Sequence, residues 1–228
     1  MESLFDNWST YEKVVANDYM HHRNFFAALE RELVTRLDEP LSIIDLGCGD
    51  CEPVDALLRH ADVSHYVGID NSKSALARAE TNLTAAGVRF SLHCGNMLDV
   101  LRRLDGEHNV AIASYALHHF EKPEKQDILT ECRRVLRDDG LLAVIDVFRN
   151  ERESRHAYFD RWEANAKLNY TALAADEFVE LLTHVRSCDF PETLSVYRRL
   201  GAAAGFEQFR DIAEDRDRLN RLVVLFPK

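Results

Sequence analysis

Several features are missing from this chain of 228 residues, and each absence excludes a class of protein. No apolar run approaches the ~20 residues that a membrane-spanning helix requires. The N-terminus is polar and mixed in charge, without the apolar stretch of a secretory signal peptide. No internal repeat or low-complexity segment occurs. We therefore expect a cytoplasmic protein without membrane contacts, folded as one domain over residues 1–228.

An excess of positive charge is also missing. Lysine and arginine number 28 against 39 aspartate and glutamate residues, so the net charge is −11 at pH 7. A net acidic chain repels phosphate backbones, and the sequence holds no long basic run. Nucleic acid is therefore an unfavourable partner, and a small molecule is the expected one.

The number and spacing of the cysteines exclude a disulfide framework. There are five, an odd number, and they are scattered over the chain. Cys48 and Cys51 form a C-x-x-C pair, which is typical of a redox dithiol or of half a zinc site. No second pair completes a zinc site, and both cysteines lie in a glycine turn that needs small side chains. We predict a packing role and no metal site, with a thiol oxidoreductase as an alternative function.

The chain is organised around residues 41–51, Leu-Ser-Ile-Ile-Asp-Leu-Gly-Cys-Gly-Asp-Cys. The apolar run of residues 41–46 predicts a buried parallel strand. Gly47 and Gly49 allow the backbone to bend sharply and leave room for a ligand. A helical pattern follows at once. Strand, glycine turn and helix together are typical of the first unit of a nucleotide-binding α/β sheet.

Residues 45–49, Asp-Leu-Gly-Cys-Gly, resemble the first motif of class I S-adenosylmethionine-dependent methyltransferases. The chain departs from that motif at Cys51, where the family has a third glycine. The dinucleotide-binding alternative is weaker, because its third glycine would fall at Glu52. The resemblance implies S-adenosylmethionine as the cofactor. It places four residues of the turn at that cofactor: Asp45, Gly47, Cys48 and Gly49.

Asp70 ends the next apolar segment, residues 65–70, and follows Gly49 by 21 residues. An acid at this spacing can accept hydrogen bonds from both ribose hydroxyls, and it resembles the family's second motif. The alternative is that Asp70 caps the helical segment that begins at Ser72.

A third predicted strand, residues 88–93, is followed by Asn96 and Met97. The resemblance implies that the Asn96 amide faces adenine, accepting from its amino group and donating to a ring nitrogen. Met97 then packs on the adenine face, unless it is ordinary core. We also expect cofactor contacts from residues elsewhere in the chain: Asn71, Ser114, His22 and Arg23. The last two belong to a mostly helical segment, residues 11–37, which the resemblance predicts to cover the cofactor and which is otherwise a solvated helix.

His118 and His119 follow a predicted strand at residues 109–114. The sequence Leu-His-His resembles what the family carries at the mouth of its active site. Imidazole titrates near neutral pH, so we predict His118 as a catalytic base and His119 as the alternative. Neighbouring residues at a strand end are expected to point to opposite sides. Both histidines would otherwise only hydrogen-bond a loop.

Strands and helices alternate from residue 41 to residue 148, which predicts an α/β sheet flanked by helices. The resemblance implies a doubly wound, mostly parallel, seven-stranded Rossmann-like sheet with an antiparallel last strand. Residues 1–40 and 149–190 are expected to form a helical cap. Residues 138–140 predict a turn. Asp189 and Glu192 predict a capping box for a helix that ends at Ala204.

The resemblance implies transfer of a methyl group from S-adenosylmethionine to an N, O or C nucleophile of a small-molecule acceptor. Two alternatives remain beside the thiol oxidoreductase. One is a carboxy-S-adenosylmethionine synthase, a tRNA-modification enzyme of the same fold that residues 189–206 faintly resemble. The other is a non-catalytic protein that only binds the cofactor.

Overall fold

The computed structural model describes residues 8–35 and 39–227. Seven strands in this part of the chain form one sheet in the order β3-β2-β1-β4-β5-β7-β6. All are parallel except β7, which is antiparallel to β5 and β6. The strands are β1 (Leu41–Leu46), β2 (Val63–Asp70), β3 (Phe90–Cys94), β4 (His108–Ser114), β5 (Leu136–Val147), β6 (Gln208–Glu214) and β7 (Asn220–Phe226). The predicted fold class, including its antiparallel last strand, is confirmed.

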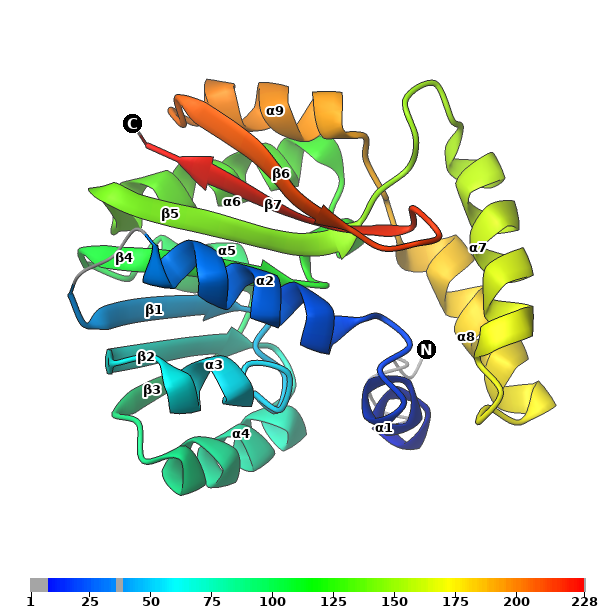
Figure 1. The fold of residues 1–228 in the computed structure, drawn as a ribbon, viewed down its shortest axis with the longest axis horizontal. Helices are drawn as coiled ribbons and strands as arrows, with labels where there is room; N and C mark the ends of the chain where they lie inside the picture. The colour runs from blue at the N-terminus through cyan, green and yellow to red at the C-terminus, as the bar shows by residue number, and fades with distance from the viewer. Residues whose placement is uncertain (1–7, 36–38, 228) are drawn as a thin grey trace.

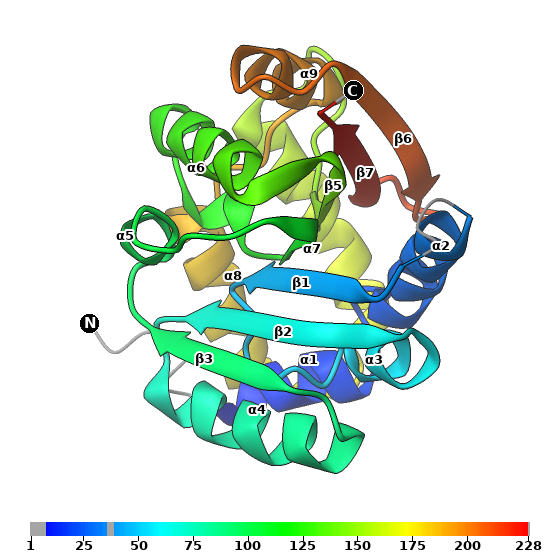
Figure 2. The same ribbon diagram turned by 90° about the vertical axis from the view of Figure 1, so that its left-hand side faces the viewer.

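The sheet is covered by helices on both faces, which explains why β1 is apolar on both sides. Ile43 packs into one core and Ile44 into the other, and both are fully buried. Figure 2 shows helices on both faces of the sheet. On the first face lie α2 (His22–Val34), α3 (Asp55–His60) and α4 (Lys73–Ala86). On the second lie α5 (Met97–Leu101), α6 (Lys122–Val135) and α9 (Leu194–Ala203).

Three further helices lie beyond the carboxyl ends of the parallel strands (Figure 1). They are α1 (Trp8–Ala16), α7 (Arg155–Asn169) and α8 (Ala175–Cys188). They share a third apolar cluster that includes Val14, Trp162 and Leu181. Helices α7 and α8 occupy the segment that the sequence predicts as an insertion. No helix in residues 8–35 and 39–227 combines the length and apolar character needed to cross a membrane.

Residues 11–37, which the sequence predicts to be mostly helical, form two helices with a bend between them. The chain forms α1 and α2, and the connection between them contains Asp18 (φ 52°) and His21 (φ 58°). A residue in the left-handed region cannot continue a right-handed helix. In the connection, Tyr19 stacks on Tyr170 at a centroid distance of 4.4 Å, which joins this bend to α7. The predicted end at Leu37 lies outside the described residues.

Two sequence predictions of local structure, a turn and a helix cap, are wrong. Residues 138–140 are part of β5 and not a separate turn. Helix α9 is capped by Thr193, whose side chain accepts a hydrogen bond from the amide of Val196. The predicted capping box therefore does not form: Asp189 ends α8 instead, and the Glu192 carboxylate pairs with Arg149.

Candidate active site

A cavity of about 450 Å³ lies where the carboxyl ends of the parallel strands meet. Open α/β sheets bind their ligands at this edge, and the volume lies in the range of small-molecule sites. Helices α1, α7 and α8 contribute to its wall. Most of the predicted cofactor and catalytic residues line it: Gly47, Gly49, Asp70, Asn71, Asn96, Met97, Ser114, His118 and His119.

The glycine turn after β1 has a backbone shape that few side chains allow. Gly47 (φ 72°) and Gly49 (φ 54°) both lie in the left-handed region. A Cβ added to Gly47 would lie 2.7 Å from the Cβ of Ala116, so the backbone approach itself requires glycine. Cys51 is left-handed too, with φ 63°. The turn therefore keeps a glycine-type conformation at the position where cysteine replaces the third glycine of the motif.

The Asp70 carboxylate is held in place by the backbone at the end of β2. Its Oδ2 accepts a hydrogen bond from the amide of Gly49 at 3.0 Å, and its Oδ1 accepts one from the amide of Ser72 at 2.8 Å. An ionised carboxylate has about four acceptor sites, so the group can accept further bonds on its cavity side. The alternative prediction, that Asp70 caps this helix, is wrong: the N-cap of α4 is Ser72, whose hydroxyl accepts a hydrogen bond from the amide of Ala75.

Asn96 caps α5, and this changes what its side chain can offer a ligand. Its Oδ1 accepts hydrogen bonds from the amides of Leu98 at 3.0 Å and Asp99 at 3.3 Å. Both lone pairs of the amide oxygen are thus used within the chain. The expectation that this amide both accepts from and donates to adenine is therefore corrected to donation alone. Met97 is buried beside the glycine turn and lines the cavity.

Two hydroxyls on the cavity wall have no hydrogen-bond partner in the described part of the chain. They are Oγ1 of Thr10, on α1, and Oγ of Ser114, at the end of β4. Buried polar atoms are almost always paired, so a polar ligand between α1 and β4 fits this arrangement. Ser114 was predicted from sequence and Thr10 was not. The spacing of Thr10, Tyr11 and Val14 on one face of a helix was the available signal.

Two predicted cofactor residues on α2, His22 and Arg23, are not among the lining residues in the described chain. His22 is buried edge-on against the ring of Tyr115, and burial lowers its pKa to about 4. The backbone amide of Arg23 donates to Asp18. On the side of the glycine turn, α1 contributes Tyr11, whose hydroxyl would lie 3.9 Å from a Cβ on Gly49.

Asp45 and Cys48 lie behind the cavity wall instead of on it. Asp45 accepts a hydrogen bond from the hydroxyl of Tyr66 at 2.6 Å, and burial raises the pKa of Asp45 to about 7. The hydrogen bond of Cys48 with Cys51, followed by burial, raises the pKa of the Cys48 thiol. A reactive cysteine needs an exposed, stabilised thiolate, and Cys48 has the opposite environment.

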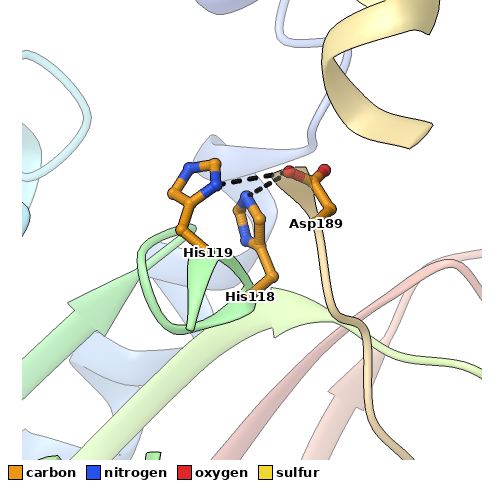
Figure 3. A group of neighbouring side chains, drawn as sticks. All are labelled: His118, His119 and Asp189. Carbon is orange, nitrogen blue, oxygen red and sulfur yellow. Dashed lines mark ion pairs between the residues drawn. The ribbon is translucent and has the colours of Figure 1, made fainter. Parts of the chain in front are cut away.

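His118, His119 and Asp189 form another part of the wall, and the buried Asp146 contacts His118 beneath them. His118 and His119 lie on the short 3-10 helix η2 (Leu117–His119), which follows β4. His118 Nδ1 lies 2.5 Å from Oδ1 of Asp146, a buried residue of β5. Its Nε2 lies 3.8 Å from Oδ1 of Asp189, and the Nδ1 of His119 lies 3.2 Å from the same oxygen. Figure 3 shows both rings turned toward Asp189.

The expectation that the two histidines point to opposite sides is therefore wrong. Alternation holds for an extended strand, but His118 and His119 follow the tighter path of η2. Their ring centroids are 4.0 Å apart. Asp189, which contacts both rings, is the C-cap of α8. The amide of the next residue, Phe190, donates a hydrogen bond to the carbonyl of His118 at 2.6 Å. The insertion is thus attached directly to the chain after β4.

The two imidazoles differ in their affinity for a proton. Burial lowers the pKa of His118, but the carboxylates of Asp146 and Asp189 outweigh burial, and the net shift is upward. Burial and the neighbouring His118 lower the pKa of His119. Lys125 lies nearby, fully buried, with its ammonium donating to the carbonyls of Phe120 and Phe190; burial lowers its pKa to about 8.

A large part of the remaining cavity wall is apolar and aromatic. It includes side chains of α7 and α8 and of the segments that follow β4 and β5: Tyr115, Phe120, Val147, Trp162, Tyr170, Leu181 and Val185. No lysine or arginine of the described residues lines the cavity. Such a wall suits an acceptor with an apolar body.

Comparison with known proteins agrees with this geometry. Residues 43–140 match the family model described as "Methyltransferase domain". The sequence is 28% identical over 126 residues to "Probable methyltransferase ltbC" of Aspergillus luteorubrus, a match covering 52% of this chain and 44% of that protein. It is 27% identical over 121 residues to a carboxy-S-adenosyl-L-methionine synthase of Campylobacter lari, covering 51% of this chain and 50% of that one. The chain thus spans about half the length of the curated relatives it matches.

The fold is shared with solved structures. The crystal structure of the S-adenosylmethionine-dependent methyltransferase SibL superposes with a TM-score of 0.59 at 16% identity, over 82% of this chain and 50% of that one. The shared fold and the matched residues confirm the resemblance that the glycine motif indicated. Residues 43–140 therefore match a methyltransferase domain in sequence, and the chain shares the fold of solved methyltransferases.

Proposed function

We propose that this protein transfers the methyl group of S-adenosylmethionine to an N, O or C nucleophile of a small-molecule acceptor. One observation carries the proposal. The cavity that contains the glycine turn and Asp70 also contains the histidines of η2 and the aromatic wall of α7 and α8. A cofactor wall and an acceptor wall therefore face a common space.

The residues of the glycine turn and of α1 would bind and orient the cofactor. S-adenosylmethionine, when bound, would supply a methyl group on a sulfonium sulfur, whose carbon a nucleophile can attack in line while the thioether leaves. Asp70 would accept hydrogen bonds from the ribose hydroxyls. Its carboxylate has acceptor sites that the amides of Gly49 and Ser72 do not occupy. The unpaired hydroxyls of Thr10 and Ser114 offer hydrogen bonds to the polar parts of the same molecule. Orientation of this kind is the main source of rate in a direct transfer.

The acceptor would lie against the apolar side chains of the insertion. Trp162 and Tyr170 of this wall meet nearly at right angles, with ring centroids 5.9 Å apart. Together with Leu181 they present a dry surface that excludes water from the transferred group. The net charge of −11 and the absence of basic side chains in the described lining favour a small molecule over nucleic acid.

Proton removal from the acceptor, where the acceptor needs it, would occur at the histidines of η2. The carboxylate of Asp146 fixes the ring of His118 and stabilises its protonated form. His119 is more exposed, with 27% of its side chain accessible, and burial and the neighbouring His118 lower its pKa, which favours the neutral ring. We retain His118 as the proposed base and His119 as the alternative.

Calorimetry and a transfer screen test the proposal in two stages. S-adenosylmethionine and its demethylated product should bind with micromolar-scale affinity, roughly −8 kcal/mol, and NAD should not. Cofactor with a labelled methyl group, incubated with small-metabolite pools, should then label a low-molecular-weight product. Heat with NAD but none with S-adenosylmethionine would refute the proposal.

The alternative functions receive less support. A carboxylated sulfonium cofactor calls for a cationic side chain at its carboxylate, and the described lining has no lysine or arginine. The relationship to the Campylobacter lari synthase covers only about half of each chain. A thiol oxidoreductase is disfavoured because Cys48 and Cys51 are buried outside the cavity wall.

A further inference from the structure

The side chains of His118, His119 and Asp189 converge in a way that general-base chemistry does not require. One nitrogen from each ring and one carboxylate oxygen all lie within 4.8 Å of one another. Figure 3 shows the three side chains directed at a common point. We propose that this cluster binds a divalent metal ion of the zinc type.

The orientation of His118 supports a metal ligand. Its Nδ1 is committed to Asp146 at 2.5 Å, which leaves Nε2 on the side of Asp189. Metal-binding histidines usually donate their other ring N–H to a carboxylate or carbonyl, which fixes the tautomer and orients the ring. Asp146 has that position. It is fully buried, and its carboxylate also accepts hydrogen bonds from the amide of Val147 and the hydroxyl of Tyr197, which hold it in place.

The Asp189 carboxylate supports the same conclusion independently. The residue is 5% exposed, and its Oδ1 has no hydrogen bond within the described chain. In the described part of the chain, that oxygen lies 3.2 Å from Nδ1 of His119 and 3.8 Å from Nε2 of His118. A cation between the three ligand atoms would give this oxygen a partner.

The donor set selects the class of ion. Two imidazole nitrogens and one carboxylate oxygen bind zinc at about 2.0–2.2 Å. Donors at that distance from one centre are roughly 3–4 Å from each other, and the contacts of 3.2 and 3.8 Å agree with this. Three protein ligands leave a fourth position for an exogenous ligand, as in catalytic zinc sites. All three residues line the cavity, so the fourth position faces it.

The role of the metal ion in catalysis rests on the proposed function, methyl transfer to a small-molecule acceptor. An acceptor hydroxyl at the fourth position would lose its proton to solvent more readily, because a bound cation stabilises the oxyanion. The oxygen then forms the bond to the methyl carbon while the carbon–sulfur bond breaks, and its electron pair stays on sulfur. The expected acceptor class is therefore an oxygen nucleophile, and in the metal-bound form His118 would act as a ligand of the ion, whereas in the metal-free form it remains the proposed base.

Metal titration of the chelator-stripped full chain tests the site without reference to activity. Calorimetry with Zn²⁺ and absorption with Co²⁺ should each show one ion per chain, bound by nitrogen and oxygen ligands. His119→Ala and Asp189→Asn should each weaken Zn²⁺ by at least about 100-fold. Asp146→Asn should weaken it about 10–100-fold, as outer partners do. His156→Ala is the matched control, because its side chain is 81% exposed on α7, and it should bind as the wild type does.

Circular dichroism establishes whether each variant is folded. If Asp189→Asn or Asp146→Asn does not fold, His119→Ala, at the most exposed of the proposed ligands, still tests the site. The proposal is overturned if no stoichiometric ion binds, or if binding survives both His119→Ala and Asp189→Asn. It is also overturned if Co²⁺ shows thiolate bands that vanish when Cys188 is replaced by serine. Cofactor calorimetry on the stripped protein keeps the two proposals separate. Cofactor heat without metal binding refutes this site alone, and metal binding without cofactor heat refutes the proposed function alone.

Discussion

Oδ1 of Asp146 lies 2.5 Å from Nδ1 of His118, and this contact joins the middle of the sheet to the cavity wall. Asp146 belongs to β5 and is fully buried, whereas His118 belongs to η2 and lines the cavity. Tyr197 of α9 lies 3.5 Å from the other oxygen of the same carboxylate. The ring of His118 is therefore positioned by the rigid core and not by a surface loop.

The first prediction concerns the two histidines. His118→Ala should lower the turnover rate by about 10²–10⁴-fold, the usual value of proton transfer in catalysis, while cofactor affinity changes by less than about threefold. The measurement is single-turnover methyl transfer with the true acceptor, beside cofactor calorimetry. His119→Ala is the paired variant. If both variants keep nearly normal turnover, orientation alone drives the transfer and neither histidine is catalytic.

The second prediction concerns Asp70. Asp70→Ala should weaken cofactor binding by about 1.5–3 kcal/mol, because hydrogen bonds to a charged group are lost. Replacement also frees the amides of Gly49 and Ser72, so part of the loss comes from a less ordered turn. Calorimetry with S-adenosylmethionine measures the effect. Asp62→Ala, an exposed carboxylate before β2, is the control. A variant that unfolds more easily but binds normally would make Asp70 a structural residue only.

The sequence predicted the sheet and the glycine turn because these depend on local patterns. Apolar runs, paired glycines and Asp70 at the following strand end all follow from residues close in the sequence. Asp189 was assigned a capping role for the same reason: its local pattern fits a cap. Its actual partners, His118 and His119, lie about 70 residues away, and only the packing of the insertion brings them together. Local periodicity holds no information on such a contact.

The α1 contribution was missed for a related physical reason. His22 and Arg23 looked suitable because polar side chains in a covering helix can bind a carboxylate. The left-handed residues between α1 and α2 turn the chain, however, so α1 and not α2 meets the cavity. The left-handed positions at Asp18 and His21 carry no glycine that would have predicted the bend from sequence. Thr10 and Tyr11 therefore line the cavity, and His22 and Arg23 do not.

The third prediction is a pH dependence that comes from Asp45. Its pKa is about 7 in the folded chain and 3.8 in the reference state, mainly because it is buried. The folded state thus binds more protons, and its stability is fully present below about pH 4 and is lost as the pH rises through about 7. The free energy of unfolding should fall by up to roughly 4 kcal/mol over this range.

Asp45→Asn should remove this part of the pH dependence. Asparagine keeps an acceptor for the hydroxyl of Tyr66 but cannot ionise. Urea unfolding measures the free energy of unfolding of wild type and variant at pH 5 and pH 8. Comparing the change between the two pH values in the two proteins cancels the contribution of the other titrating groups. Asp62→Asn on the surface should follow the wild-type profile. Equal pH dependence in wild type and Asp45→Asn would show that Asp45 is ionised at little cost.

The fourth prediction concerns the thiols of the glycine turn. Cys48 and Cys51 are both buried in this turn, and the interaction with Cys51 raises the pKa of the Cys48 thiol. Forced oxidation to a disulfide should weaken cofactor binding, because disulfide geometry is restrictive and the turn must keep its left-handed backbone to fit a ligand. Mass spectrometry confirms the bond, and calorimetry measures the affinity. Cys51→Ala should bind cofactor equally before and after oxidant. Unchanged affinity of the oxidised wild type would contradict the prediction.

The position of β7 determines when this chain can fold during synthesis. β7 is inserted between β5 and β6, although it follows both in the sequence. A nascent chain that ends before residue 220 therefore exposes two unpaired strand edges, one of them on the buried β5. Exposed edges of this kind invite pairing with other chains. The ribosome must release residues 220–226 before the sheet can close, so a stalled or truncated translation product is expected to aggregate rather than to fold partially.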